Sequence, residues 1–266
     1  MRHPVIWAFL LSGVLCGVAR ADDNPPPAPD ADQSWASRAQ VGYAKTGGNT
    51  DTSTANALFH IAHVVGDWKF LFGFEGLYGS TKGETTAQAW DLHLQANYNI
   101  TDRLYWYGGL RYDDNKFSGF VYQETASTGA GYQFVKTDET KLTGQIGVGA
   151  RRLRPEVLTE DAVGGIVSTM ELESTTDAVL DAAVNLEHAF NSATKIIAGV
   201  AVESGKDNTM TNANLSLQVK MTNVLALSAG YQYIRNSKPP AGSGPSNSLV
   251  TLNLVYELKN PKLAPE

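Results

Sequence analysis

The stretch AWDLHLQANYNITDRLYWYGGLRY, residues 89–112, decides the fold because it alternates apolar and polar side chains on both sides of one tight turn. The apolar series before and after the turn at residues 101–102 is Trp90, Leu92, Leu94, Ala96, Tyr98, Ile100, Leu104, Trp106, Leu110 and Tyr112. A period of two that continues for about ten residues on each side of a turn predicts an antiparallel hairpin.

A half-buried sheet of a soluble protein gives the same alternation. In this hairpin, however, the apolar face ends in large aromatic rings, and the other face holds amides, acids and Arg111. Such a division favours a barrel whose outer surface meets lipid and whose interior meets water.

The N-terminus predicts export. Arg2, an apolar run over Val5–Leu15 and a small-residue site at Ala19–Ala21 are typical of a cleaved signal peptide, residues 1–21. Lipidation of Cys16 is the less favoured alternative, because Leu15 stands where a small residue should precede the cysteine. Residues 22–34 are proline-rich and acidic, which predicts a disordered periplasmic tether.

Cleavage removes Arg2 and Arg20, leaving 19 of the 21 basic residues against 27 acidic ones, a net charge of −8. It also removes the single cysteine, so a disulfide framework is excluded, and the negative charge argues against nucleic-acid binding. After Trp35 no apolar run approaches the roughly 20 residues of a spanning helix. Two classes of exported protein remain, a soluble β domain and an outer-membrane barrel.

The alternation recurs in twelve segments, which predicts an antiparallel up-and-down transmembrane β-barrel of about 12 strands over residues 35–258, followed by a tail at 259–266. A polar loop is expected over 113–121, and a long connection over 153–176 with a further short strand at 163–170. Short connections alternate with longer ones, as periplasmic turns and extracellular loops do. The ends nearest the short turns carry Trp35, Trp68, Tyr98, Trp106, Phe134, Phe190 and Tyr256, and the opposite ends carry Tyr43, Tyr78, Trp90 and Tyr112. These two sets predict interfacial aromatic girdles.

Several short sequence motifs in the chain resemble those of a known family. They are GYAKTGGNTDTS (42–53), LRYDDNKFSGFVYQ (110–123), GAGYQF (129–134), SGKDNTM (204–210), YQYIRNSKPPAG (231–242) and LNLVYEL (252–258). In this order they are similar to the family of salt-induced outer membrane proteins. The resemblance implies an outer-membrane β-barrel of Gram-negative bacteria and a link to salt or osmotic stress, and it brings no reaction, ligand or catalytic residue.

The lumen is the main candidate site. The lumen-lining residues that we predict are Arg38, Asp91, His93, Arg111, Arg151 and Glu187, and further inward charges are Lys69, Glu75, Glu203 and Lys220. An extracellular-rim motif is predicted at Asp113, Asp114, Lys116 and Phe117. The glycine pairs 129/131 and 147/149 are expected to make room for long side chains or curvature. These charges either brace a closed barrel or line a narrow pore.

Enzymatic and metal motifs are weak. His60 and His63 are three apart in a strand, so they point to opposite faces and do not converge on one ion. His188 is placed on the lipid side, and no serine can be argued to lie beside a histidine, as a lipid hydrolase would need. We expect no catalytic residue, no metal and no cofactor.

We therefore predict a non-enzymatic outer-membrane protein, with a narrow small-solute or ion channel linked to salt stress as the preferred function. A closed structural or surface-binding barrel and an outer-membrane lipid hydrolase are the alternatives. The expected partners are outer-membrane lipid and lipopolysaccharide, the barrel-assembly machinery and small solutes or ions, with no nucleic acid.

Overall fold

The computed structural model describes residues 35–46, 51–160, 162 and 166–258. The predicted signal peptide, tether and C-terminal tail lie outside these residues. Within them the chain forms thirteen strands, namely β1 (Trp35–Thr46), β2 (Thr52–Val65), β3 (Trp68–Thr81), β4 (Glu84–Asn99), β5 (Leu104–Asn115), β6 (Phe120–Lys136), β7 (Thr140–Glu160), β8 (Ile166–Glu171), β9 (Thr175–Ala189), β10 (Thr194–Gly205), β11 (Thr209–Lys220), β12 (Leu225–Asn236) and β13 (Ser246–Leu258). No helix in the described residues is long and apolar enough to cross a membrane.

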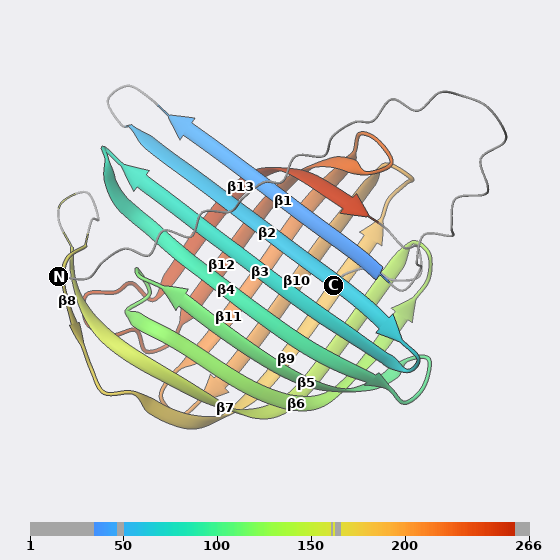
Figure 1. The fold of residues 1–266 in the computed structure, drawn as a ribbon, viewed down its shortest axis with the longest axis horizontal. Coiled ribbons are helices and arrows are strands. Elements are labelled where there is room, and N and C mark those ends of the chain that lie inside the picture. Colours follow the sequence, from blue (N-terminus) through green and yellow to red (C-terminus); the bar gives the residue numbers. More distant parts are fainter. Residues whose placement is uncertain (1–34, 47–50, 161, 163–165, 259–266) are drawn as a thin grey trace, which may run out of the picture. The chain divides into compact units, whose positions relative to one another are not determined.

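Twelve of the strands form a closed antiparallel barrel, as the sequence predicts. Each barrel strand pairs with the next along the chain, β7 pairs with both β6 and β9, and β1 pairs with β13 to close the ring. Figure 1 shows β1–β6 crossing one wall and β9–β13 the other. A closed barrel leaves no unpaired strand edge, which is what a sheet in lipid requires.

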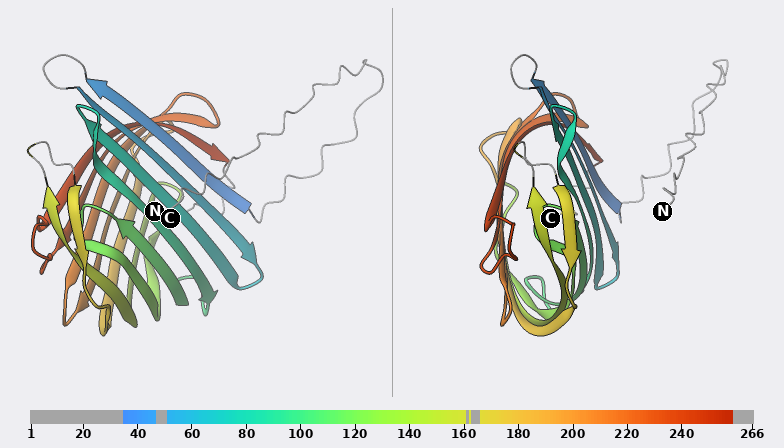
Figure 2. Two further views of the ribbon diagram at one scale, coloured as in Figure 1. Left: turned by 60° about the vertical axis from the view of Figure 1, so that its left-hand side comes forward. Right: turned by 90° about the vertical axis from the view of Figure 1, so that its left-hand side faces the viewer.

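The remaining strand, β8, is not part of the ring. It pairs only with the far end of β7, from Glu156 to Glu160, and the two form a hairpin that extends beyond the barrel wall (Figure 2). The short strand expected within 163–170 therefore exists, over Ile166–Glu171. The polar loop expected over 113–121 is shorter, because β5 continues to Asn115 and β6 begins at Phe120.

The longest connection of the described residues, 237–245, and the β7–β8 hairpin lie at one end of the barrel, although the other described connections at that end are as short as those at the opposite end. We call the end with residues 66–67, 100–103, 137–139, 190–193 and 221–224 the turn end, and the end with residues 82–83, 116–119, 206–208 and 237–245 the loop end. Trp35 and Leu258 both lie at the turn end, because twelve barrel strands return the chain to its starting side. At the loop end, Lys82 and Gly83 have φ of 53° and 89°, as a tight hairpin turn requires.

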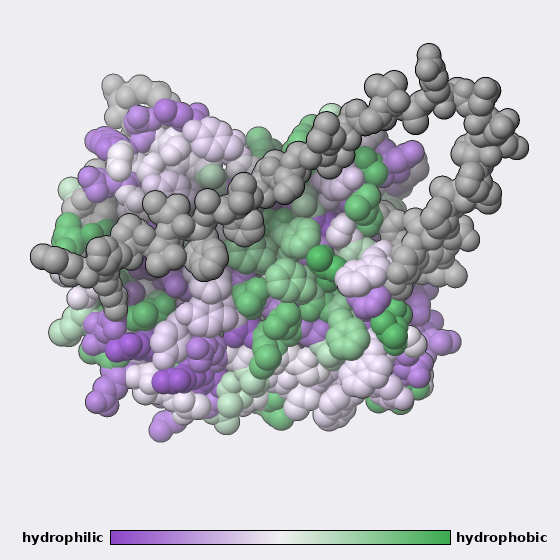
Figure 3. Space-filling model, in the orientation of Figure 1, coloured by the Kyte–Doolittle hydropathy of each residue, from purple (hydrophilic) through white to green (hydrophobic). Residues whose placement is uncertain are grey.

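The outer wall is apolar, and the inward face is polar. Large exposed hydrophobic side chains recur on every barrel strand, including both predicted aromatic sets except Tyr112, which is half-buried between Trp90 and Tyr122. Figure 3 shows such side chains gathered over the middle of one wall. Buried polar residues, among them Gln95, Asn97, Thr125 and Gln218, lie on the inward face. Near the turn end, Ala36 and Ala62 form a small apolar cluster against which Val64 and Leu71 pack.

Candidate functional site in the lumen

Arg111 on β5 is the centre of an ion cluster inside the barrel. Its Nε donates to Asp91 Oδ2 at 2.7 Å, its Nη1 donates to Glu203 Oε1 at 3.2 Å, and its Nη2 lies 3.7 Å from Asp113 Oδ2. Three carboxylates share one guanidinium, whose donors are fixed in a planar fork. The cluster therefore has a defined geometry and more negative than positive charge.

The cluster spans the lumen. Glu203 belongs to β10, which is not a sheet neighbour of β5, and its second oxygen accepts from Thr125 Oγ1 of β6 at 3.0 Å. Arg111 Nη1 also lies 3.7 Å from Met210 Sδ on β11. Since these contacts join strands that are not adjacent in the sheet, the side chains narrow the interior at this level.

Carboxylates dominate this level of the lumen. Glu75, Asp91 and Asp113 lie in register on β3, β4 and β5, and Asp181 lies in register with Glu203. Ser127 Oγ donates to Asp181 Oδ2 at 3.0 Å. The side chains of Glu75 and Asp91 are 41% and 25% exposed. This level of the lumen therefore brings five carboxylates close to one guanidinium.

A second cluster occupies the lumen near the turn end. Arg38 donates from Nη2 to Gln218 Oε1 at 3.0 Å and lies 3.6 Å from Glu257. Lys195 Nζ lies 3.3 Å from both Glu187 and Glu257. These residues belong to β1, β9, β10, β11 and β13, so this cluster also joins non-neighbouring strands. This cluster has two basic and two acidic side chains, whereas carboxylates outnumber the basic group in the cluster around Arg111.

The loop end is covered. Arg151 has none of its side chain exposed; its Nη2 donates to the carbonyl of Asn208 at 2.5 Å and lies 3.5 Å from Asp177. Asn208 in turn donates to Asn236 Oδ1 at 2.6 Å and accepts from the amide of Lys238 at 3.2 Å. Asn208 thus joins the 206–208 connection to the start of the 237–245 connection, and Arg151 anchors Asn208.

The β7–β8 hairpin completes this cover. The amide of Glu156 donates to Gly119 O at 2.8 Å, and the amide of Leu158 donates to Ala241 O at 3.3 Å. Gly242, at φ 87°, packs so closely on the backbone of Leu158 that a β-carbon would collide with it. The β7–β8 hairpin therefore packs with the 116–119 and 237–245 connections as one layer at the loop end.

The structure places each predicted lumen residue on an inward face. Arg38 and Glu187 belong to the turn-end cluster, Asp91 and Arg111 to the middle cluster, and Arg151 lies beneath the loop-end layer. His93 lies in register with Arg111 and beside Gly73. Glu257, Lys195 and Asp181 were missed as site residues. The alternation along each strand places them on the inward face, but the sequence does not show their partners on distant strands.

The predicted rim residues divide between two surfaces. Asp113 faces the lumen and contacts Arg111, whereas Asp114 is the next residue of β5 and faces outward. Lys116 and Phe117 lie in the turn at the loop end, where Lys116 Nζ donates to Gln88 Oε1 at 3.0 Å. The four residues therefore do not form one surface motif, because β5 extends further than expected.

His60 and His63 point to opposite faces of the barrel wall. His60 Nε2 lies 3.8 Å from Glu75 inside the barrel, whereas His63 stacks on Trp35 outside it at 3.8 Å between ring centroids. His188 lies outward, 2.8 Å from Thr140 Oγ1 through Nδ1 and edge-on to Phe190. Among the described residues, no group of three or more His, Cys, Asp or Glu could hold a metal ion.

One family model and several solved structures are similar to this chain. A family model described as a protein of unknown function, DUF481, matches residues 39–258. The NanC porin is 14% identical over 84% of this chain and all of its own, with a TM-score of 0.46. The translocator domain of the autotransporter NalP from Neisseria meningitidis is 15% identical over 85% of this chain and 89% of its own, at 0.46. An outer membrane channel from Pseudomonas putida F1 is 9% identical over 87% of this chain and all of its own, at 0.45. No curated protein sequence matches. At such low similarity, function has to be argued from the residues of this chain.

Proposed function

The chain belongs to the DUF481 family of proteins of unknown function, and from the charged lumen of this member we propose that it is a narrow outer-membrane channel that prefers small cations. The observation that carries the proposal is the set of five inward carboxylates around Arg111. A barrel of twelve strands is wider than the smallest filled barrels, so its polar interior has room for a narrow path for small solutes.

The outer wall supports the membrane location. Apolar side chains such as Leu94, Val148 and Leu252 are exposed around the barrel, and aromatic rings mark both edges of this surface. In water such a wall would be an aggregation liability, whereas in lipid it is the favourable surface. The short connections would then face the periplasm and the covered loop end the cell exterior.

Conductance of the refolded protein in planar bilayers tests the channel. We expect small unitary currents and a reversal potential in a KCl gradient that indicates K⁺ over Cl⁻, because the narrow level is rich in carboxylates. A protein that inserts into the bilayer and conducts at no salt concentration or voltage would contradict the proposal.

The variant Arg111→Ala tests whether the Arg111 cluster determines the ion selectivity of the channel. It removes the one guanidinium that Asp91, Asp113 and Glu203 share, so we expect larger currents and a stronger preference for cations. Arg103→Ala is the matched control, because Arg103 is exposed in a turn outside the lumen and donates to the carbonyl of Phe134. Equal selectivity in the two variants would remove the Arg111 cluster from the conduction path.

A closed structural barrel is the second candidate. The contacts between Arg111 and Glu203 and between Arg38 and Gln218 join distant strands, and such bracing stiffens a filled barrel as well as a narrow pore. This candidate predicts an insulating barrel in which Arg111→Ala lowers thermal stability without creating a current. The same bilayer experiment therefore separates the two functions.

A role in salt stress and the absence of enzymatic activity stay predictions. For the first, a deletion strain should grow more slowly at raised salt and recover when the wild-type gene is restored. For the second, hydrolysis of lipid in mixed micelles that contain the protein should not exceed the hydrolysis in buffer without protein. Detectable hydrolysis would favour the membrane-surface hydrolase instead.

A further inference from the structure

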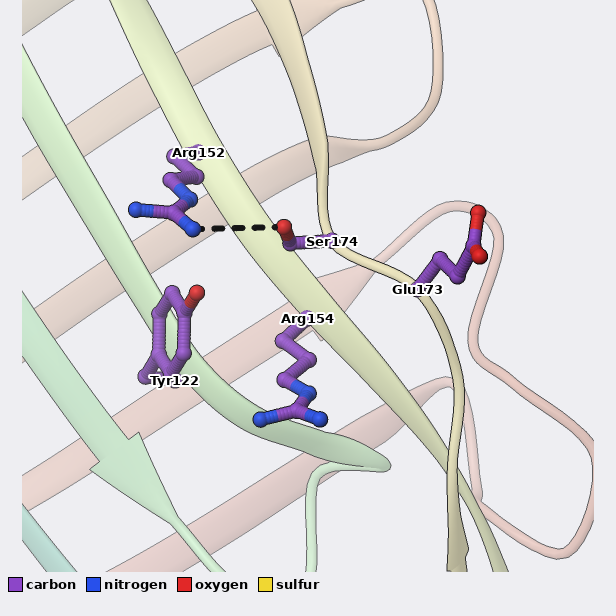
Figure 4. A pocket seen from close by; sticks show the side chains of 5 residues that line it. All are labelled: Tyr122, Arg152, Arg154, Glu173 and Ser174. Atoms are coloured by element: carbon purple, nitrogen blue, oxygen red, sulfur yellow. Dashed lines mark hydrogen bonds between the residues drawn. The ribbon is translucent and has the colours of Figure 1, made fainter.

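A hollow of about 410 Å³ lies on the outside of the barrel near the loop end. It is lined by Tyr122 of β6, Arg152 and Arg154 of β7, and Glu173 and Ser174 just before β9. Arg152 alternates along β7 with the inward, buried Arg151 and Leu153, so it faces away from the lumen. Figure 4 shows the two arginine side chains and the tyrosine ring arranged around one space.

Local contacts hold both guanidinium groups in place. Arg152 lies over the Tyr122 ring with Cζ 5.8 Å from the ring centroid, and its Nη2 donates to Ser174 Oγ at 3.4 Å. Arg154 donates from Nε to the carbonyl of Leu172 at 3.3 Å, and its Nη2 lies 3.0 Å from Glu171. Two positioned guanidinium forks side by side match the oxygens of a phosphate group.

Of the two arginines, only Arg154 has an ion pair among the described residues. Glu171 pairs with Arg154, while the carboxylate of Glu173 points away from the two arginines in Figure 4. Glu124 is in register with Arg152 on the neighbouring strand, but no ion pair joins the two within the described residues. Arg152 therefore keeps a positive charge available to an anion.

The height of the hollow on the wall identifies the kind of anion. On β7 the outward residues that precede Arg152 include Ile146 and Val148, which are 66% and 58% exposed. The rings of Trp90, Tyr112 and Tyr122 lie in a row at the same edge, with centroids 4.8 and 6.3 Å apart. Aromatic rows of this kind sit at the headgroup level of a bilayer, where lipid phosphates lie.

We propose that Arg152, Arg154 and Tyr122 form a binding site for the phosphate of a membrane lipid in the outer leaflet. The acyl chains of that lipid would lie along the apolar wall of β6 and β7, below the hollow. The inference rests on the membrane location and orientation in the proposed function and is independent of whether the barrel conducts.

Native mass spectrometry of the full refolded chain in detergent, titrated with diphosphorylated lipid A, tests the site. We expect saturable binding to the wild type, and binding at least about tenfold weaker for the double variant Arg152→Gln/Arg154→Gln, because charge-assisted contacts are lost. Arg103→Gln, at the turn end, should bind like the wild type. Arg152→Lys should be intermediate, since it keeps the charge and loses the fork.

Two further arms identify the source of the phosphate. Dephosphorylated lipid A should bind the wild type only as weakly as diphosphorylated lipid A binds the double variant, and excess inorganic phosphate should not displace the phosphorylated lipid. Equal binding by wild type and double variant, or displacement by inorganic phosphate, would overturn the site. Each variant is first checked for heat-modifiable migration in gels, so that misfolded protein is set aside. Loss of conductance with intact lipid binding would count against the channel and not against this site.

Discussion

At the scale of single residues, Gly129 and Gly147 show why part of the lumen wall must lack side chains. The two glycines are paired across β6 and β7, and a β-carbon on Gly129 would collide with the backbone of Ile146 and Gly147. A β-carbon on Gly147 would meet the Tyr107 hydroxyl and the carbonyl of Thr128. We therefore expect Gly129→Ala to lower the free energy of unfolding by about 1–3 kcal/mol, the usual cost of overpacking.

Urea unfolding of the barrel in detergent, followed by intrinsic fluorescence, measures this change. Gly108→Ala is the matched control, because Gly108 lies on the outer face of β5 and nothing lies within 4 Å of where its β-carbon would be. If the two variants were equally stable, the close packing of β6 on β7 would not explain the glycines.

The same scale shows what the sequence could and could not predict. Alternation alone predicted that Trp90 faces outward and that Asp91 and Arg111 face inward, because side chains on a strand alternate between the two faces of the sheet. It could not pair Arg111 with Glu203, since this contact depends on how the strands tilt and stagger around the ring. The lumen residues were thus predictable one by one, and their partners were not.

At the scale of elements, the β7–β8 hairpin is the part of the loop-end layer whose docking we expect to depend on pH. Glu156 lies on the hairpin beyond the barrel wall, in register with Glu171. Burial, followed by repulsion from Glu171 and Asp114, raises the pKa of the Glu156 carboxyl above its ordinary value of 4.5. Folding of the hairpin therefore favours the protonated carboxyl, and its ionisation at higher pH weakens the docking.

We expect the docking of the hairpin to become more stable as the pH falls from above this raised pKa towards 4.5. Hydrogen-exchange protection of the Leu158 and Leu172 amides, which bond to Ala241 and Pro155, measures it after correction for intrinsic exchange rates. Glu156→Gln should protect these amides at neutral pH and remove the pH dependence. Glu173→Gln is the control, and an equal effect there would exclude Glu156 as the cause.

Element boundaries were the least predictable feature, for a physical reason. The polar residues Asp113, Asp114 and Asn115 resemble a loop, yet Asp113 is satisfied by Arg111 inside the barrel and β5 continues through it. Similarly, β7 runs to Glu160 because β8 returns alongside it, which the sequence indicated only as a short strand. Partners supplied by the fold override the turn propensity of the local residues.

At the scale of the whole molecule, the barrel depends on the seam between its first and last strands. β1 and β13 share six paired positions, from Ser37 with Leu258 to Gly42 with Asn253, whereas β12 and β13 share eleven. The shorter ladder makes this seam the place where we expect the ring to open first. The mature chain predicted here has no cysteine, so an engineered disulfide can test the seam without interference from other thiols.

Ala39→Cys with Tyr256→Cys places two cysteines directly opposite each other across the seam, on the outer face. Paired antiparallel residues have Cα separations of about 4.5–5.5 Å, within the range that a disulfide spans. Because the bridge closes nearly the whole chain into one loop, we expect oxidation to stabilise the barrel by about 2–4 kcal/mol, read as a higher thermal midpoint than in the reduced form. The matched pair Tyr231→Cys and Val250→Cys crosses the longer β12–β13 ladder and closes a far shorter loop, so its gain should be smaller. An equal or larger gain at the second pair would mean that the barrel does not open at the β1–β13 seam.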